Sequence, residues 1–356
     1  MPVIGTQVSP YLEAGDWQFS YGYRYQKSDR HFVGDQEDKE RESEHSQVIN
    51  TIHLMDFSVT HAFSKRFSGT LALPVQFATR SSPIRDAEGD IISRDTQRAN
   101  GIGDMVLSGM VWLLDPNEFL NTNVALSLGP KFPTGQDDVR HKATIRQGSN
   151  FIREERTVDQ SIQPGDGGFG FVAGIQVFYT MFEKYTWFLQ GSYLFNPRNT
   201  NGVPTFRTLA GEEVMSVADS YIGKAGLGMP IPFLDKYGFG CSLAGRVEGV
   251  PVRDVIGESD GFRRPGLAFS IEPGISWVYG NHLLGLSAPV ALYRNRFQSV
   301  ADQNAEPERH GDAAFADYLI LFSYSWRFAG PARPTSPASS DTEAPPRVYI
   351  PAPVAQ

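Results

Sequence analysis

The chain contains no long apolar run and only one cysteine among its 356 residues. No apolar run approaches the roughly 18 residues that a membrane-spanning helix needs, which excludes a helical inner-membrane protein. The chain is therefore either soluble or crosses a membrane as a closed sheet, whose backbone polar groups pair between strands. Cys241 has no partner for a disulfide and is interpreted as a small apolar filler.

Sequence patterns for catalysis, metals and nucleotides are also missing. His53 and His61 are too far apart on one strand to bind one metal, and most of the other histidines fall in expected loops. There is no Gly-x-Ser-x-Gly motif, and the glycines around Asp166 precede a strand-like segment instead of the helix of a phosphate loop. We expect no enzyme, no cofactor, no metal and no nucleic-acid partner. A barrel hydrolase with catalytic residues scattered over adjacent strands stays an alternative.

What the chain does contain is apolar and polar residues in strict alternation. In 317–328, apolar side chains occupy every second position from Tyr318 to Phe328, and Ser323, Ser325 and Arg327 stand between the last four of them. Near the start, a similar stripe consists of Trp17, Phe19, Tyr21, Tyr23 and Tyr25. A period of two indicates strands, and uniform aromatic stripes suit lipid and its interface. A last strand that ends on an aromatic residue is typical of outer-membrane barrels.

The alternation recurs about a dozen times, and short connections alternate with long polar ones, as in an up-and-down barrel with external loops. The expected strands are 16–27, 47–63, 67–79, 102–114, 122–131, 168–180, 185–196, 219–231, 237–249, 266–278, 282–295 and 316–328. The expected long loops are 27–46, 80–99, 132–166, 197–217, 251–264 and 296–313. The fold class is thus all-β, a transmembrane antiparallel barrel of about 12 strands with short periplasmic turns.

The face opposite the apolar stripe carries mostly small residues, whereas a soluble sandwich normally exposes Lys, Glu and Thr there. Small residues suit a crowded lumen. Prolines inside or at the ends of the strands predict bulges or irregular walls, because proline removes a donor from the ladder. These prolines are Pro74, Pro130, Pro230, Pro273 and Pro289.

Composition divides the chain into three parts. An N-terminal periplasmic segment is expected over 1–15, the barrel over 16–328, and a disordered tail rich in Pro, Ala and Ser over 329–356. The expected location is the bacterial outer membrane. Residues 1–7 have neither the charged nor the apolar region of a signal peptide, so we expect that the signal was removed or that the start is misplaced.

Four short motifs resemble an outer-membrane family of transporters named for the meta-pathway of phenol degradation. They are Gly101-Ile-Gly-Asp104, Lys131-Phe-Pro-Thr-Gly135, Glu248-Gly-Val-Pro251 with Asp254, and Ser287-Ala-Pro-Val-Ala-Leu-Tyr-Arg-Asn295. The resemblance covers nearly all of 16–328. It implies a barrel that takes up aromatic compounds, although no phenol-binding residue is recognisable.

Projecting the alternation onto a barrel selects candidate lumen residues. They are Arg24, Gln76, Arg80, Asp104, Lys131, Gln190, Lys224, Arg246, Glu248, Glu272, Arg294 and Asp317, and Asp56 shares this face. Mixed charges in a narrow space favour structural ion pairs across the lumen. The alternative is a basic ladder of Arg24, Lys224, Arg246 and Arg294 that faces acids on the other wall of a diffusion pore.

The sequence thus predicts a porin-like passive channel for small apolar or aromatic solutes, surrounded by outer-membrane lipid and lipopolysaccharide. A plugged barrel without conductance, whose loops bind a partner, stays open as the second hypothesis. The acidic run 35–45 is interpreted as a solvated loop, with bridging of divalent cations at the lipopolysaccharide surface as the alternative.

Overall fold

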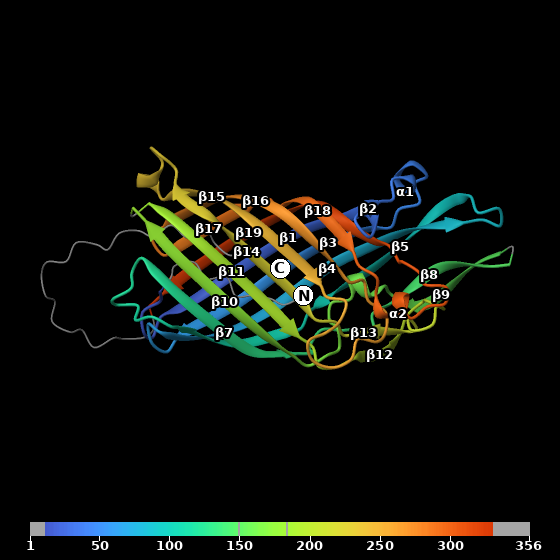
Figure 1. Ribbon diagram of the computed structural model, residues 1–356, viewed down its shortest axis with the longest axis horizontal. Coiled ribbons are helices and arrows are strands. Elements are labelled where there is room, and N and C mark those ends of the chain that lie inside the picture. Colours follow the sequence, from blue (N-terminus) through green and yellow to red (C-terminus); the bar gives the residue numbers. More distant parts are fainter. Residues whose placement is uncertain (1–10, 149, 183, 330–356) are drawn as a thin grey trace, which may run out of the picture.

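The computed structural model describes residues 11–148, 150–182 and 184–329, and its main feature is a closed antiparallel barrel (Figure 1). Strand β1 (Trp17–Val33) pairs with β3 (Ile49–Ala62) on one side and with β19 (Ala313–Phe328) on the other. This pairing of the first and last strands closes the sheet. Because Trp17 pairs with Phe328, the barrel begins and ends at the same rim. The predicted segments 1–10 and 330–356 lie outside the described residues.

The other wall strands follow in chain order around the barrel. They are β4 (Phe67–Arg85), β5 (Ile91–Ile102) with β6 (Met105–Trp112), β7 (Thr122–Phe132), β10 (Gly170–Met181), β11 (Tyr185–Phe195), β14 (Ser220–Pro230), β15 (Phe239–Val250), β16 (Gly266–Tyr279), and β17 (His282–Ser287) with β18 (Val290–Arg296). Since β5 and β6 share one wall position and β17 and β18 another, the wall has 12 positions. The predicted up-and-down barrel is confirmed.

The two faces of the wall differ in the way the alternation predicts. Inward positions such as Gln18 and Ser20 are buried, whereas outward positions such as Leu126, Leu128 and Leu243 are exposed apolar residues. A continuous apolar outer surface suits contact with lipid. In the described part of the chain, no helix combines the length and apolar character required to cross a membrane.

The barrel wall is broken at two places, between β5 and β6 and between β17 and β18, and a proline lies beside each break. This agrees with the predicted irregularities. The break between β5 and β6 lies beside Pro74, whose carbonyl accepts a hydrogen bond from Gly103 N at 2.8 Å. The break between β17 and β18 lies beside Pro273, whose carbonyl accepts from Ala288 N at 3.1 Å. Each break allows the chain to leave the regular ladder near the lumen.

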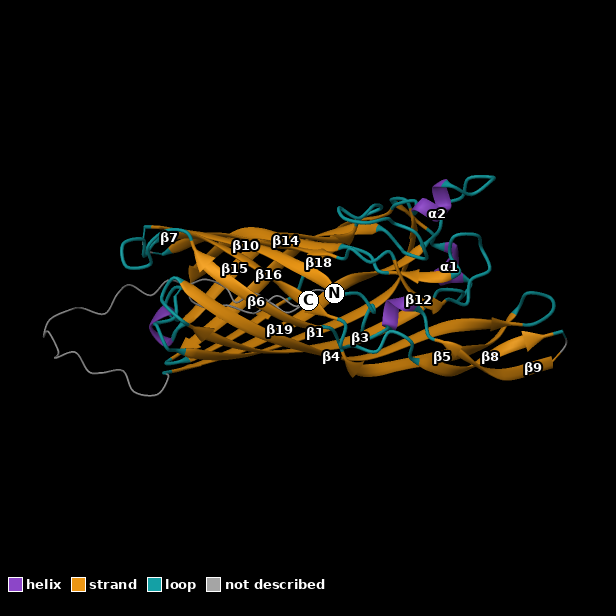
Figure 2. Ribbon diagram, turned by 90° about the horizontal axis from the view of Figure 1, so that it is seen from below, coloured by secondary structure: helices purple, strands orange, loops and turns teal. Residues whose placement is uncertain are grey.

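The long connections contain more regular structure than we expected. Segment 80–99, expected as a loop, is mostly a hairpin of β4 and β5, and β5, β8 and β9 extend past the end of the barrel (Figure 2). Other elements there are β2 (Gln36–Glu37), α1 (Glu40–Ser43), β8 (Arg140–Gln147), β9 (Asn150–Thr157), η1 (Gln160–Ile162), β12 (Thr200–Pro204), β13 (Val214–Ser216) and α2 (Val300–Gln303), while η2 (Asp235–Tyr237) lies in a short turn. A hairpin exposed to water on both faces needs no apolar stripe. The apolar–polar alternation of the sequence therefore did not predict it.

Candidate functional site

A network of buried ion pairs crosses the lumen. Glu272 of β16 contacts Lys224 Nζ of β14 and Arg246 Nη1 of β15, each at 3.3 Å. Arg246 Nη2 also contacts Glu248 at 2.7 Å, and Arg24 of β1 reaches Glu248 at 3.0 Å. Since β16, β18 and β19 separate β15 from β1 in the wall, this last pair spans the interior. We call these five residues the lumen network.

Most charges of the lumen network are buried, although the Glu248 side chain is 23% exposed. Arg24 and Arg246 are each 2% exposed and Glu272 is 3% exposed. Buried charges of this kind are tolerated when they are paired and hydrogen-bonded, and Ser287 adds a hydrogen bond of 2.9 Å to Glu272. The network therefore places paired side chains across this level of the lumen.

The first two motifs of the family resemblance meet in space and fasten the long connection after β9. Asp104 accepts hydrogen bonds from Gly135 N at 2.9 Å and Asp166 N at 3.2 Å. Lys131 forms ion pairs with Asp104 at 3.3 Å and with Asp166. A Cβ at Gly135 would lie 2.7 Å from Gly165 Cα, so the two backbones touch only because both residues are glycines. We call this cluster the loop anchor.

From the loop anchor, residues 158–165 fold inward as a mouth segment. Val158 and Ile162 are fully buried against Ala78 and Ala99, which line the inner wall of β4 and β5. Gln76, one of the predicted lumen residues, donates to Ile162 O at 2.8 Å. The mouth segment therefore narrows the barrel opening on the side of the long connections.

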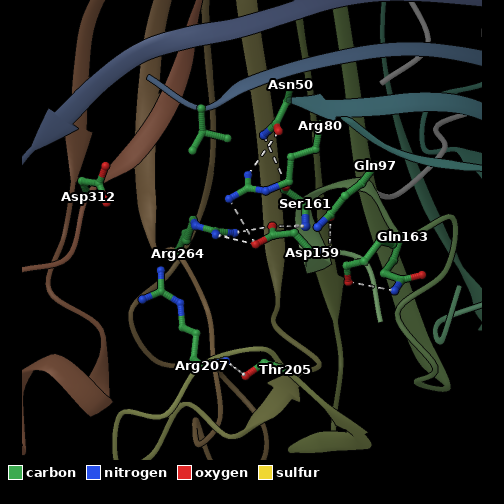
Figure 3. A network of polar contacts seen from close by, with 12 residues as sticks. Asn50, Arg80, Gln97, Asp159, Ser161, Gln163, Thr205, Arg207, Arg264 and Asp312 are labelled. Atoms are coloured by element: carbon green, nitrogen blue, oxygen red, sulfur yellow. Dashed lines mark hydrogen bonds and ion pairs between the residues drawn. The ribbon is translucent and has the colours of Figure 1, made fainter. Parts of the chain in front are cut away.

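Asp159 ties the mouth segment to β4 and to the connection that precedes β16 (Figure 3). Its two carboxylate oxygens accept hydrogen bonds of 2.8 Å from Arg264, and Arg80 lies 3.4 Å away. Burial alone would raise the pKa of this carboxyl, but Arg264 and Arg80 outweigh it and hold the pKa of Asp159 well below its usual range. Asn50 extends the contact by bonding Arg80 and Ser161, at 3.2 Å each.

A cavity of about 270 Å³ lies between the mouth segment and the lumen network. Ser161 and Arg264 line it at one end, and Arg24 and Glu248 line it at the other. Its walls are mostly small or apolar, and they include Ile52, Val250, Ala268, Ala291, Ala313, Ala316 and Leu319. Such a cavity suits a small, largely apolar solute with few polar groups.

The cavity reaches a weak place in the barrel wall. Strands β18 and β19 share one register pair, Val290 with Tyr318, and farther up β18 bridges directly to β1 through Gly34 and Arg296. We call the stretch between these two points the wall gap. Pro289, Ala291, Phe315 and Tyr318 of the cavity lining flank it.

Charged side chains occupy the wall gap in place of a regular ladder. Arg294 Nε donates to the backbone carbonyl of Ala316 at 3.1 Å, and Arg294 Nη2 contacts Asp317 at 2.6 Å. Arg30 holds the other carboxylate oxygen of Asp317 at 3.0 Å. Arg294 thus has partners different from those of Arg24, Lys224 and Arg246. The alternation did not predict this because Arg294 lies beyond the break at Pro289.

The structure thus divides the predicted lumen residues among several places. Five form the lumen network, Asp104 and Lys131 belong to the loop anchor, Gln76 and Arg80 hold the mouth segment, and Arg294 and Asp317 lie in the wall gap. Gln190 lies beside Lys224 in the ladder between β11 and β14. Sequence reasoning missed Asp159, Ser161 and Arg264, which lie in connections without periodicity, where only contact across the barrel reveals a role.

No family model and no curated protein matches the chain. Solved structures do match, among them an outer membrane channel from Pseudomonas putida F1, with a TM-score of 0.55, 12% identity, and coverage of 89% of this chain and 97% of that one. Two others are the P. putida toluene transporter TodX (TM-score 0.42, 8% identity, 89% and 91% covered) and the Ralstonia pickettii toluene transporter TbuX (0.42, 9%, 89% and 90%). At these identities the likeness concerns the fold, which is that of an outer-membrane barrel. The resemblance to the phenol-degradation family stays a prediction.

Proposed function

We propose that this barrel is an outer-membrane channel through which small apolar or aromatic compounds enter passively, without a catalytic step. The observation that carries the proposal is the cavity of about 270 Å³, lined mainly by small and apolar side chains. A cavity of about 150 Å³ already accommodates a benzene ring, so the available space suits a single substituted ring. The solved channels with a similar barrel agree with this function but do not identify the solute.

The onward route in this proposal is the wall gap and not the lower lumen. An apolar solute cannot replace the hydrogen bonds of the lumen network, because separating buried ion pairs costs several kcal/mol. The ladder between Val290 and Arg296 is already interrupted, and the cavity lining flanks this interruption. Passage there requires displacement of the Arg294 side chain but no rupture of regular strand pairing.

A second candidate function is a closed barrel whose extended hairpins bind a partner. Two observations favour it: β5, β8 and β9 extend beyond the barrel wall, and the ion pair between Asp159 and Arg264 holds the mouth segment in place. The two candidates differ in one measurable respect, since a closed barrel admits no solute.

The test is uptake of radiolabelled toluene by cells that have intact lipopolysaccharide and produce the barrel. Ala268, which pairs in register with Glu248 on the lumen face, lines the cavity. Replacing it with Trp fills the cavity without removing a charge. We expect initial uptake above that of cells without the barrel, and a loss of most of this excess in Ala268→Trp.

Phe269→Trp is the matched control, because Phe269 is the next residue, faces outward and is 43% exposed. It should leave uptake unchanged. If folded wild-type barrel in the outer membrane gave no uptake above background, the channel would be rejected in favour of the closed barrel. Equal uptake by wild type and Ala268→Trp would show that the cavity is not on the route.

A further inference from the structure

Several arginines gather at the mouth of the barrel and share a smaller number of carboxylates, although the whole chain has a net charge of −8. Arg80 and Arg264 share Asp159, Arg207 and Arg309 share Glu212, and Arg296 and Arg309 share Asp302. In this inner cluster five arginines thus contact three carboxylates. Arg41 with Asp312 and Arg263 with Asp254 add neutral pairs.

Arg264 brings this positive charge to the cavity. Asp159 accepts one hydrogen bond from each of its two terminal nitrogens, whereas a guanidinium has five N–H groups. The Arg264 side chain keeps 18% exposure and lines the cavity. Its guanidinium carbon lies 4.5 Å from the centre of the buried Phe262 ring, and that of Arg207 lies 4.3 Å from the same ring, which restrains both side chains.

Ser161 and Asn50 stand beside Arg264 at this end of the cavity and offer further hydrogen-bonding groups (Figure 3). The cavity wall away from this end consists largely of Ala268, Ala291, Ala316 and Leu319. A ligand with an anionic group and an apolar ring fits this arrangement, with the anion at Arg264 and the ring against these small apolar residues, while Arg24 and Glu248 at the far end are already paired with each other. A carboxylate matches the Arg264 end of the cavity, because hydrogen bonds from a guanidinium to a carboxylate are strong.

We infer that the cavity binds small aromatic acids, with the carboxylate at Arg264 and the ring against the small apolar residues. This inference rests on the proposed function and names the class of solute that the channel prefers. The volume of about 270 Å³ accommodates one ring with its carboxylate. Arg30 and Arg294 at the wall gap offer further positive charge to the carboxylate of such a solute.

The experiment is calorimetric titration of the purified, detergent-solubilised full chain at low salt with benzoate and, separately, with benzylamine. These probes share a ring and differ in the sign of their charge at neutral pH. We expect benzoate to bind at least tenfold more tightly than benzylamine. Arg264→Gln should weaken benzoate binding at least tenfold, and Arg264→Lys should retain most of it.

Arg253→Gln is the control with an equal change in charge, since Arg253 is exposed in the same connection as Arg264. It should bind benzoate like the wild type. Ala268→Trp, which leaves every charge in place, should abolish binding, and it keeps the test valid if Arg264→Gln fails to fold. Equal binding of both probes, or benzoate binding that neither Arg264→Gln nor Ala268→Trp reduces, would overturn the inference. Toluene uptake without benzoate binding would reject the inference and leave the channel, whereas benzoate binding without uptake of either compound would reject the channel alone.

Discussion

Within the lumen network, the carboxylate of Glu272 pairs with basic side chains from two different strands. It contacts Lys224 and Arg246 and accepts a hydrogen bond from Ser287. Removing one partner of a buried ion pair costs more than the pair contributes, because the remaining charge stays buried without compensation. The stability of the barrel should therefore be sensitive to this one carboxylate.

Glu272→Gln should lower the free energy of unfolding by about 3 kcal/mol. The measurement is urea unfolding in lipid vesicles, followed by tryptophan fluorescence. The exposed Glu213 provides the control, since Glu213→Gln should change little. Replacing Glu272 by Leu together with Lys224 by Met should recover part of the loss. An unchanged stability in Glu272→Gln would contradict the role assigned to the network.

At this scale the sequence predicts the face of a residue but not its partner. The alternation correctly places Arg24, Arg246 and Glu272 among the buried side chains. It cannot tell that Arg24 meets Glu248, because their strands are far apart in the chain and the contact depends on strand stagger and tilt. Asp159 and Arg264 gave no signal, since their segments have no period.

The mouth segment is the element that contributes Ser161 to the cavity lining. Hydrophobic burial of Val158 and Ile162, the loop anchor and the ion pairs of Asp159 all hold it in place. The strands themselves could be predicted from their period, whereas this inward fold could not. A loop that packs inside a barrel follows the contacts it finds there, and those contacts are distant in sequence.

Asp159→Asn should loosen the mouth segment. Because the pKa of Asp159 in the folded protein lies below that of a free carboxyl, its ion pairs persist at neutral pH and weaken only as the pH falls below about 4. Hydrogen–deuterium exchange at pH 7 should show residues 158–165 exchanging roughly tenfold or more faster in the variant. Asp138→Asn, on an exposed residue of the same connection, serves as the control. Equal protection in both variants would show that apolar packing alone holds the segment.

For the molecule as a whole, prolines accompany the two breaks in the barrel wall, and the wall gap lies at one of these breaks. The sequence was sufficient to predict an irregular wall near Pro289. It was not sufficient to predict that β18 would contact β1 directly through Gly34 and Arg296, because this bridge bypasses β19. The architecture of the barrel was thus predictable from its period, but the site was not, since it consists of contacts between non-neighbouring segments.

Arg294→Leu should speed toluene uptake severalfold if solutes leave through the wall gap. The substitution removes the guanidinium that bridges β18 to the Ala316 carbonyl and to Asp317, so less must be displaced for passage. Arg140→Leu, on an exposed residue of β8, provides the comparison and should leave uptake unaltered. Slower or equal uptake in Arg294→Leu would argue for another route.

The lumen network has an electrical consequence. Ions carry current only through a continuous path of water, and side chains that pair across the lumen interrupt such a path. If the barrel is the proposed channel, these ion pairs would let it admit organic solutes while it carries little ionic current. We then expect bilayer recordings of the wild-type barrel to show little current, so the flux of solute is the quantity that tests the proposed channel.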